Sequence, residues 1–439
     1  MKNIPVIFSK SIGKWYALCL LGSSLLGADF FAIPFPYFHL TPYRLLLLLS
    51  PILLFLLHTN KEYKQAWKNY NYPYFVFLWI WLVYAILSGL WVKDYVLWGS
   101  GLLFFLAGCI SSYFIVSTFN TRKDFFTAFR LVEGIALLIA FLGLWEICTA
   151  RYFFVQETYA IRYTECALGS FVHRPLPVAT FSNVNDLSSF LYFSFFIALA
   201  LFFLRTNKAA KVLDVFCMLI YLVVIVAGQS RSVFLGFILA LLALLIYWIC
   251  KFIRQKKWKR IGIWTLVGVT VLGCCLFLTK ETLLSSNFWL DDRSDTSRMN
   301  LMKDGFIYLY NHWFMGVGWG NIEYYRSQSM DPMSIDTITQ IHNWWMEILV
   351  TSGIFIFAGY LWIYLRNYKH LFQASLVLKN RVEQKNMLVF FMAFTGCVIV
   401  FVASSSFVRC DWFWVILALL FAYCGHHPIS NENQKKLDL

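Results

Sequence analysis

The sequence is poor in charged residues. Asp, Glu, Lys and Arg make up 14% of its 439 residues, whereas 60% are hydrophobic and 20% are aromatic. Mean hydropathy is +0.63. A soluble domain of this size could not present such a surface to water, so the composition excludes one and predicts an integral membrane protein.

Other absences limit the architecture and the chemistry. The 11 cysteines contain no C-x-x-C spacing typical of a metal site, and most of them lie in or beside apolar runs, where Cys acts as a small hydrophobe. No linker rich in Pro, Gly or Ser and no repeat divides the chain, so we predict a single transmembrane domain over residues 1–439. The first apolar run has no convincing A-x-A cleavage site, and we expect it to remain as a helix.

Long apolar runs recur along the whole chain. A helix needs about 20 apolar residues to cross the hydrocarbon core of a bilayer. We find about twelve such runs, and they predict an all-α, polytopic membrane protein with about 12 transmembrane helices. The runs are centred near Leu25, Leu49, Trp81, Leu106, Ala140, Phe195, Val224, Ala240, Val271, Ile356, Val398 and Leu417.

The basic residues predict the orientation of these helices. Most of the 37 Lys and Arg residues fall in alternate loops, which would be cytoplasmic if the N-terminus is inside. We therefore expect both termini to be cytoplasmic. The same pattern accounts for the net charge of +14, so we expect no nucleic-acid partner.

A large outer loop is predicted over residues 280–341, between helices 9 and 10. Loops of this length in compact proteins are usually functional or disordered, and this one is rich in aromatic residues. Its middle, Thr296 to Asn311, predicts an amphipathic helix that rests on the outer membrane surface. The apolar stripe consists of Met299, Met302, Phe306, Ile307 and Tyr310. A tight turn at Gly316, Gly318 and Gly320 is expected to follow.

Charged residues are almost absent from the predicted bilayer midplane. Six lie at or near the outer helix ends: Glu146, Asp186, Arg231, Glu347, Arg409 and Asp411. An ion-coupled transporter places its binding groups near the midplane. An enzyme that acts on a lipid-linked substrate at the outer leaflet would collect them at one face, which is the pattern found here.

Two arginines in outer segments are candidates for binding phosphate. Arg231 lies in GQSRSVFLGF at an outer helix junction, and Arg298 begins the predicted surface helix. A guanidinium group donates hydrogen bonds in a rigid fork that suits phosphate oxygens, and a helix start favours anions. Each arginine is equally consistent with an ordinary interfacial or solvated charge. Together they could neutralise a diphosphate leaving group.

His342 and Asn343 stand at the start of the next helix, beside two tryptophans. Histidine is suited to accept a proton from a sugar hydroxyl, although a residue of the interfacial aromatic belt is at least as good an explanation. Asn183 and Asp186 lie in TFSNVNDLSSF, where they suit a helix cap but could also bind sugar hydroxyls. The string GVGWG does not join a strand to a helix, so it does not indicate a dinucleotide site.

In this order, the motifs FSNVND, SRS, GVGWGN and HN resemble the O-antigen ligase and Wzy-type polysaccharide polymerase superfamily, from about Thr180 to Gly359. The resemblance implies an inverting glycosyltransferase of the bacterial cytoplasmic (inner) membrane, with an undecaprenyl-diphosphate-linked glycan as donor and without a required metal or cofactor. It implies that Arg231 and Arg298 contact the leaving group and that His342 is the base or orients the acceptor. The expected substrate-binding residues are Asn343, Gly316, Gly318, Gly320, Asn183 and Asp186.

The acceptor stays open between two members of this superfamily. A polymerase joins one lipid-linked repeat to another, and a chain-length regulator would be a candidate partner. A ligase transfers the finished glycan to lipid A core or another final acceptor. We favour the polymerase because polymerisation is the more widespread task, and we keep a polysaccharide or small-molecule transporter as the alternative from another functional class.

Overall fold

The computed structural model describes most of the chain, and its secondary structure is dominated by helices. Two short antiparallel hairpins add to them: β1 (Ile33–Pro34) with β2 (His39–Leu40), and β3 (Ile161–Glu165) with β4 (Phe171–Pro175). The described residues are 6–27, 30–34, 39–58, 71–154, 161–165, 171–181, 183–256, 262–263, 292–329, 341–402, 406 and 409–429.

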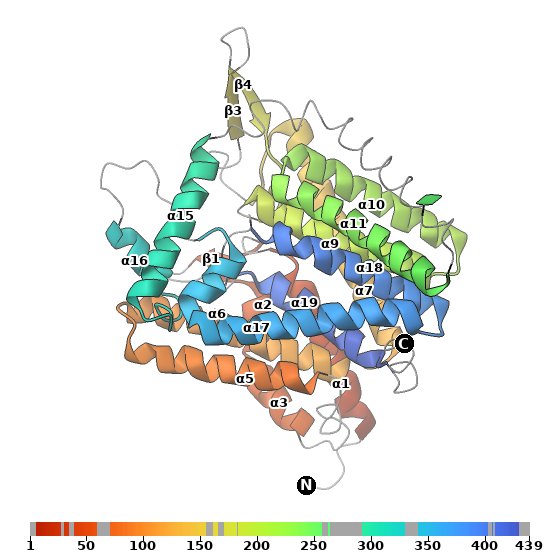
Figure 1. Ribbon diagram of the computed structural model, residues 1–439, viewed down its shortest axis with the longest axis horizontal. Coiled ribbons are helices and arrows are strands. Elements are labelled where there is room, and N and C mark those ends of the chain that lie inside the picture. The colour runs from red at the N-terminus through yellow and green to blue at the C-terminus, as the bar shows by residue number, and fades with distance from the viewer. Residues whose placement is uncertain are drawn as a thin grey trace.

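In the part of the chain that the structure describes, eight helical spans are long and apolar enough to cross a membrane. They are α5 (Tyr72–Leu87) with the 3-10 turn η1 (Ser88–Leu90), α6 (Tyr95–Thr118), α7 (Arg122–Thr149), α9 (Val184–Leu204), α10 (Lys208–Gly228), α11 (Arg231–Arg254), α17 (Trp344–Val377) and α18 (Arg381–Val400). Figure 1 shows helices of this set running side by side. Each span contains one of the expected centres, from Trp81 to Val398, so the prediction of an all-α polytopic membrane protein is confirmed.

The other four expected centres are not matched in the same way. Leu417 lies in the shorter apolar helix α19 (Asp411–His426), and Leu25 directly follows α1 (Val6–Ser24). Leu49 falls between α2 (Pro42–Leu47) and α3 (Ser50–His58). Val271 lies outside the described residues. The total of about twelve membrane-spanning helices therefore stays a prediction.

Local caps explain where several helices begin. Asn183 caps α9, and its side-chain oxygen accepts a hydrogen bond from the Asn185 backbone N–H at 2.8 Å. Thr121 and Asp124 form a capping box at the start of α7. Asp94 accepts hydrogen bonds from the backbone N–H groups of Val96 and Leu97 at the start of α6.

The centre of the bundle is α19, in which every residue from Trp412 to Cys424 is buried. Around it, glycines let neighbouring helices approach closely. A Cβ atom on Gly236 of α11 would lie 2.5 Å from Val400 Cγ2 of α18, and one on Gly396 would lie 2.3 Å from the Gly236 carbonyl oxygen. Small residues at such crossings are typical of membrane helix packing.

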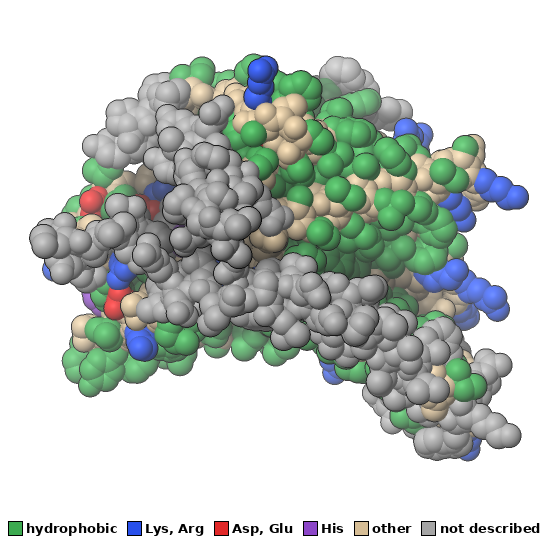
Figure 2. All heavy atoms as spheres, turned by 90° about the horizontal axis from the view of Figure 1, so that it is seen from above, with side chains coloured by type: hydrophobic (Ala, Val, Ile, Leu, Met, Phe, Trp, Pro, Cys, Tyr) green, Lys and Arg blue, Asp and Glu red, His purple; other side chains and the backbone are tan. Residues whose placement is uncertain are grey.

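The outer surface of the spans is mainly apolar, and basic side chains gather toward one end. Figure 2 shows green hydrophobic side chains over the sides of the bundle and Lys and Arg at its right-hand end. Lys251 and Arg254 stand in the last turn of α11, where that helix reaches the end. This distribution is what the positive-inside pattern predicts.

At the opposite end, α15 (Asp292–Asn311) runs across the helix ends and α16 (Ile322–Ser329) lies beside it. The predicted helix over residues 296–311 falls within α15. This helix begins at Asp292, so the expectation that Arg298 begins it is wrong, and Arg298 lies six residues beyond the helix start. Met302 packs toward the protein, whereas Met299, Phe306, Ile307 and Tyr310 are exposed. Residues 264–291 and 330–340 lie outside the described part, so the boundaries of the 280–341 loop and the position of α15 on a membrane stay predictions.

Candidate functional site

The three glycines of GVGWG form a turn with backbone angles that few other residues adopt. The φ angles of Gly316, Gly318 and Gly320 are 87°, 92° and 73°. Glycine reaches this left-handed region without the steric penalty of a Cβ atom. The spacing of the glycines is therefore explained by the turn itself.

This turn fills a break in α17. Gly353, inside α17, has φ 74° and ψ 177°, which interrupts the helical hydrogen bonding. The N–H groups of Val317 and Gly318 donate to the carbonyls of Val350 and Thr351 at 2.8 and 3.2 Å. In return, the Ile354 N–H donates to the Phe314 carbonyl at 3.0 Å. The turn thus satisfies backbone groups that the break exposes, as an apolar surrounding requires.

The other side of the turn is fixed to the junction of η1 and α6. The Trp319 N–H donates to the Ser88 hydroxyl at 3.0 Å, and the Trp319 ring is 1% exposed. Asn321 Oδ1 accepts from the N–H groups of Lys93 and Asp94 at 3.0 and 2.8 Å. These contacts give the GVGWGN motif a packing role; its predicted contact with substrate is not tested by them.

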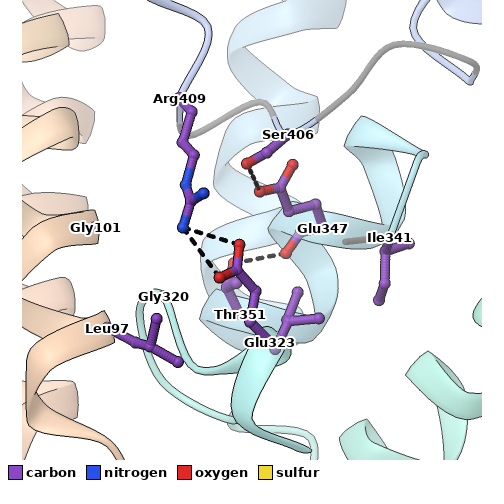
Figure 3. A pocket seen from close by; sticks show the side chains of 10 residues that line it. Leu97, Gly101, Gly320, Glu323, Ile341, Glu347, Thr351, Ser406 and Arg409 are labelled. Atoms are coloured by element: carbon purple, nitrogen blue, oxygen red, sulfur yellow. Dashed lines mark hydrogen bonds and ion pairs between the residues drawn. The ribbon is translucent and has the colours of Figure 1, made fainter. Parts of the chain in front are cut away.

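A small polar pocket lies where the turn meets α6, α16 and α17 (Figure 3). Its polar lining consists of Glu323, Glu347, Thr351, Ser406 and Arg409, and Gly320 and Ile341 also line it. Arg409 Nη2 lies 2.9 Å from Glu323 Oε1, and the Ser406 hydroxyl donates to Glu347 Oε1 at 2.5 Å. The polar groups of three chain segments, α16, α17 and the segment that precedes α19, therefore converge on one point.

His342 directly follows Ile341, which lines this pocket. Its neighbour Asn343 caps α17, with Oδ1 accepting from the Met346 N–H at 3.3 Å. Asn343 is buried and His342 is partly exposed. Capping accounts for Asn343 structurally, and the predicted substrate contacts of both residues stay predictions.

The FSNVND and SRS motifs come together on the other side of the bundle. The Ser230 hydroxyl donates to Asn185 Oδ1 at 2.9 Å. Arg231, which is partly exposed, is the first residue of α11, and Asp186 is buried in the first turn of α9. The two motifs are therefore parts of one structural unit, although 45 residues separate Asn185 from Ser230.

Packing through α17 and α18 joins the elements that carry the three predicted catalytic residues. Gly236 of α11 contacts Val400 at the end of α18, and the carbonyl of the next residue, Phe401, accepts from the Trp344 N–H at 3.1 Å. On the other flank, α15 packs against α17, where a Cβ atom on Gly305 would lie 3.2 Å from Ile341 Cδ1. Arg298 lies two turns before Gly305 in α15. Arg231, Arg298 and His342 thus belong to the same end of the bundle.

The family comparison covers this end of the molecule. Residues 216–361 match the model of the O-antigen ligase family. The resemblance to the O-antigen ligase superfamily is confirmed. The matched segment contains Arg231, Arg298 and His342, together with Asn343 and the glycine turn.

A curated relative extends the similarity over almost the whole length of this chain. The chain is 26% identical over 421 residues to the teichuronic acid biosynthesis protein TuaE of Bacillus subtilis (strain 168). The alignment covers 92% of this chain and 82% of that protein. The part of the chain before Thr180, which has no landmark motif of its own, therefore falls largely within the similarity.

The structure adds polar residues that sequence reasoning did not assign. Arg44 Nη2 lies 3.1 Å from Asp411 Oδ2, and its guanidinium stands 4.3 Å from the centroid of the Phe104 ring. Burial raises the pKa of the Cys410 thiol, and the nearby charges of Asp186, Asp411 and Glu347 raise it further. Acidic groups of α9, α17 and α19 therefore lie close to one another. Arg44 binds Asp411, and Ser406 binds Glu347. Nothing in the local sequence around Arg44 or Ser406 predicts that either residue contacts these acidic groups.

Among the residues that the structure describes, no three His, Cys, Asp or Glu side chains are placed to hold a metal ion. The acidic side chains at the site are instead engaged by Arg44, Arg409 and Ser406.

Proposed function

We propose that this protein is an inverting, metal-independent glycosyltransferase of surface polysaccharide assembly. It takes an undecaprenyl-diphosphate-linked glycan at the outer leaflet of the bacterial cytoplasmic (inner) membrane and transfers it to the acceptor sugar of another lipid-linked repeat. The observation that carries this proposal is the family-matched segment, because it contains Arg231 at the start of α11, Arg298 within α15 and His342 just before α17.

In the proposed reaction, an acceptor hydroxyl attacks the anomeric carbon on the face opposite the diphosphate. His342 accepts the hydroxyl proton as the new glycosidic bond forms. The bond to the diphosphate oxygen breaks, and undecaprenyl diphosphate departs with the bonding electrons. Arg231 and Arg298 neutralise the charge that develops on this leaving group. Attack from the opposite face inverts the anomeric configuration.

The proposed orientation has both termini in the cytoplasm and the active site outside. Arg231 begins α11 and Arg254 ends it, and the helix has 24 residues. At 1.5 Å per residue this helix is about 36 Å long, enough to cross a hydrocarbon core of about 30 Å. The basic end then faces the cytoplasm and Arg231 faces outward.

Two products remain candidates. We favour the polymerase because polymerisation is the more widespread task. Similarity to TuaE, whose name places it in teichuronic acid biosynthesis, supports a role in glycan assembly. A ligase that transfers finished glycan to lipid A core or another final acceptor is favoured by the description of the matching family as O-antigen ligase. A chain-length regulator is a proposed partner of the polymerase.

Deletion and complementation test the proposal. A strain that lacks the gene should accumulate single lipid-linked repeats if the protein is a polymerase, or finished polymer on the carrier lipid if it is a ligase. Complementation with Arg231→Ala, Arg298→Ala or His342→Ala should fail although the protein is folded and membrane-inserted. Near-normal glycan in all three strains would contradict the assignment, and altered uptake or flipping with normal polymer length would favour a transporter.

A further inference from the structure

The pocket in Figure 3 is lined by Ile341 and Glu347, which stand on either side of the proposed base in the chain. Ile341 lines it, His342 follows in the chain, and Glu347 enters from the first turn of α17. Glu347 is 6% exposed, so its carboxylate is held almost wholly inside the protein. A buried carboxylate at the wall of a cavity is placed to contact a molecule that enters it.

The size of the pocket limits what it can receive. Its cavity volume is about 30 Å³, and a cavity of about 10 to 15 Å³ already holds one water molecule. Pockets that enclose whole small-molecule ligands are about 300 to 1,000 Å³. The cavity therefore suits one hydroxyl group rather than a complete sugar ring.

The polar side chains that line the pocket can both donate hydrogen bonds to a hydroxyl group and accept them from it. A carboxylate accepts hydrogen bonds, a guanidinium donates them, and Ser and Thr hydroxyls do both. Arg409 is engaged by both oxygens of Glu323, at 2.9 and 3.0 Å, and Glu347 is oriented by the Ser406 hydroxyl. Two carboxylates beside one arginine repel a phosphate, whereas they attract the positive end of an O–H dipole.

We propose that this pocket binds a hydroxyl group of the acceptor sugar and that Glu347 accepts its hydrogen bond. The ion pair of Arg409 with Glu323 fixes the position of these two side chains in the pocket lining, which contacts the acceptor hydroxyl group. The inference rests on the proposed function, because it gives the acceptor its own subsite, separate from the arginines that face the diphosphate. It makes Glu347 and Arg409 determinants of acceptor specificity.

Steady-state transfer by the purified full-length protein tests this proposal. The donor is the lipid-linked repeat, and the acceptor is the same repeat as a soluble oligosaccharide without lipid. We expect Glu347→Gln to raise the KM for the soluble acceptor about 10-fold, because a hydrogen bond to a neutral amide oxygen replaces one to a charged carboxylate. The KM for the lipid-linked donor should be unchanged. Ser327→Ala, at an exposed position of α16, is the matched control and should change neither constant.

Arg409→Gln provides a second variant at a side chain that is 43% exposed, so that the test does not depend on the folding of a buried variant. Like Glu347→Gln, this variant should raise the KM for the soluble acceptor. Acceptors that each lack one hydroxyl sharpen the assay: the wild-type protein should discriminate against one of them, and Glu347→Gln should lose that discrimination.

The outcomes separate this inference from the proposed function. Transfer by the wild-type protein together with unchanged acceptor KM values in both variants would overturn the subsite and leave the function intact. A fall in kcat alone would also overturn it. If the wild-type protein forms no glycosidic bond from any lipid-linked repeat, the proposed function fails and the subsite fails with it.

Discussion

Gly316 and Gly353 approach each other so closely that neither position has room for a side chain. A Cβ atom on Gly316 would lie 2.6 Å from the Gly353 backbone nitrogen, and one on Gly353 would lie 2.5 Å from the Met315 carbonyl carbon. Both residues also have positive φ angles. The contact locks the loop between α15 and α16 into the break of α17, and it holds the pocket in shape.

Replacing either glycine should therefore destabilise the protein. We expect Gly353→Ala to lower the free energy of unfolding by about 2 to 5 kcal/mol, from left-handed backbone strain and overpacking together. Thermal unfolding of the purified protein measures this. Gly134→Ala is the matched control, because no atom lies within 4 Å of its added Cβ, and it should be neutral or slightly stabilising. Equal melting temperatures for both variants would contradict the prediction.

Glu146 holds the chain that leads into α9. Its Oε2 accepts hydrogen bonds from the N–H groups of Val178 and Ala179 at 2.7 and 2.8 Å, and the residue is buried. Glu146→Ala leaves both donors without this partner, so we expect a loss of about 1 to 3 kcal/mol for each unsatisfied group. Glu146→Gln keeps an acceptor oxygen and should be milder. Proteolysis of the 149–184 connection and thermal unfolding together measure the effect; equal behaviour of the two variants would argue against it.

Asn321 is the polar anchor of the glycine turn. Its side chain exchanges hydrogen bonds with the backbone of Lys93 and Asp94, and it is fully buried. Asn321→Ala should lower the melting temperature and release the turn, because buried backbone groups lose their partners. Hydrogen exchange of the Trp319 and Val317 amides should increase. Asn311→Ala, at an exposed position, should leave both measurements unchanged.

The exposed stripe of α15 provides a test of its predicted place on the membrane surface. Phe306 and Tyr310 are 53% and 71% exposed. If this face rests in the interface, Phe306→Glu should reduce transfer activity in lipid vesicles, because a charged group replaces buried apolar area. Activity in detergent should fall less. Asn300→Glu, at another exposed position, should have little effect in either medium, and equal losses in both would contradict the interfacial position.

Local properties of the sequence determined much of the fold. The eight spans follow from apolar runs of sufficient length, since a membrane requires a helix wherever such a run crosses it. Asn183 and Asn343 cap their helices because a cap depends on neighbours within one turn. The glycine turn and the helix at 296–311 were also predictable. The β3 and β4 hairpin was not expected, because two five-residue strands give a weak signal in a chain dominated by helices.

Only the tertiary structure showed which distant residues pair with one another at the site. Arg409 pairs with Glu323 across 86 positions, Ser406 binds Glu347 across 59, and Arg44 reaches Asp411 across 367. The sequence placed Arg231, Glu347, Arg409 and Asp411 at outer helix ends, but it did not indicate which of them meet. Membrane helices are apolar on most faces, so their periodicity does not say which helices are neighbours. Close backbone contacts such as those at Gly236, Gly353 and Gly396 decide that, and the polar pairs at the helix ends follow from them.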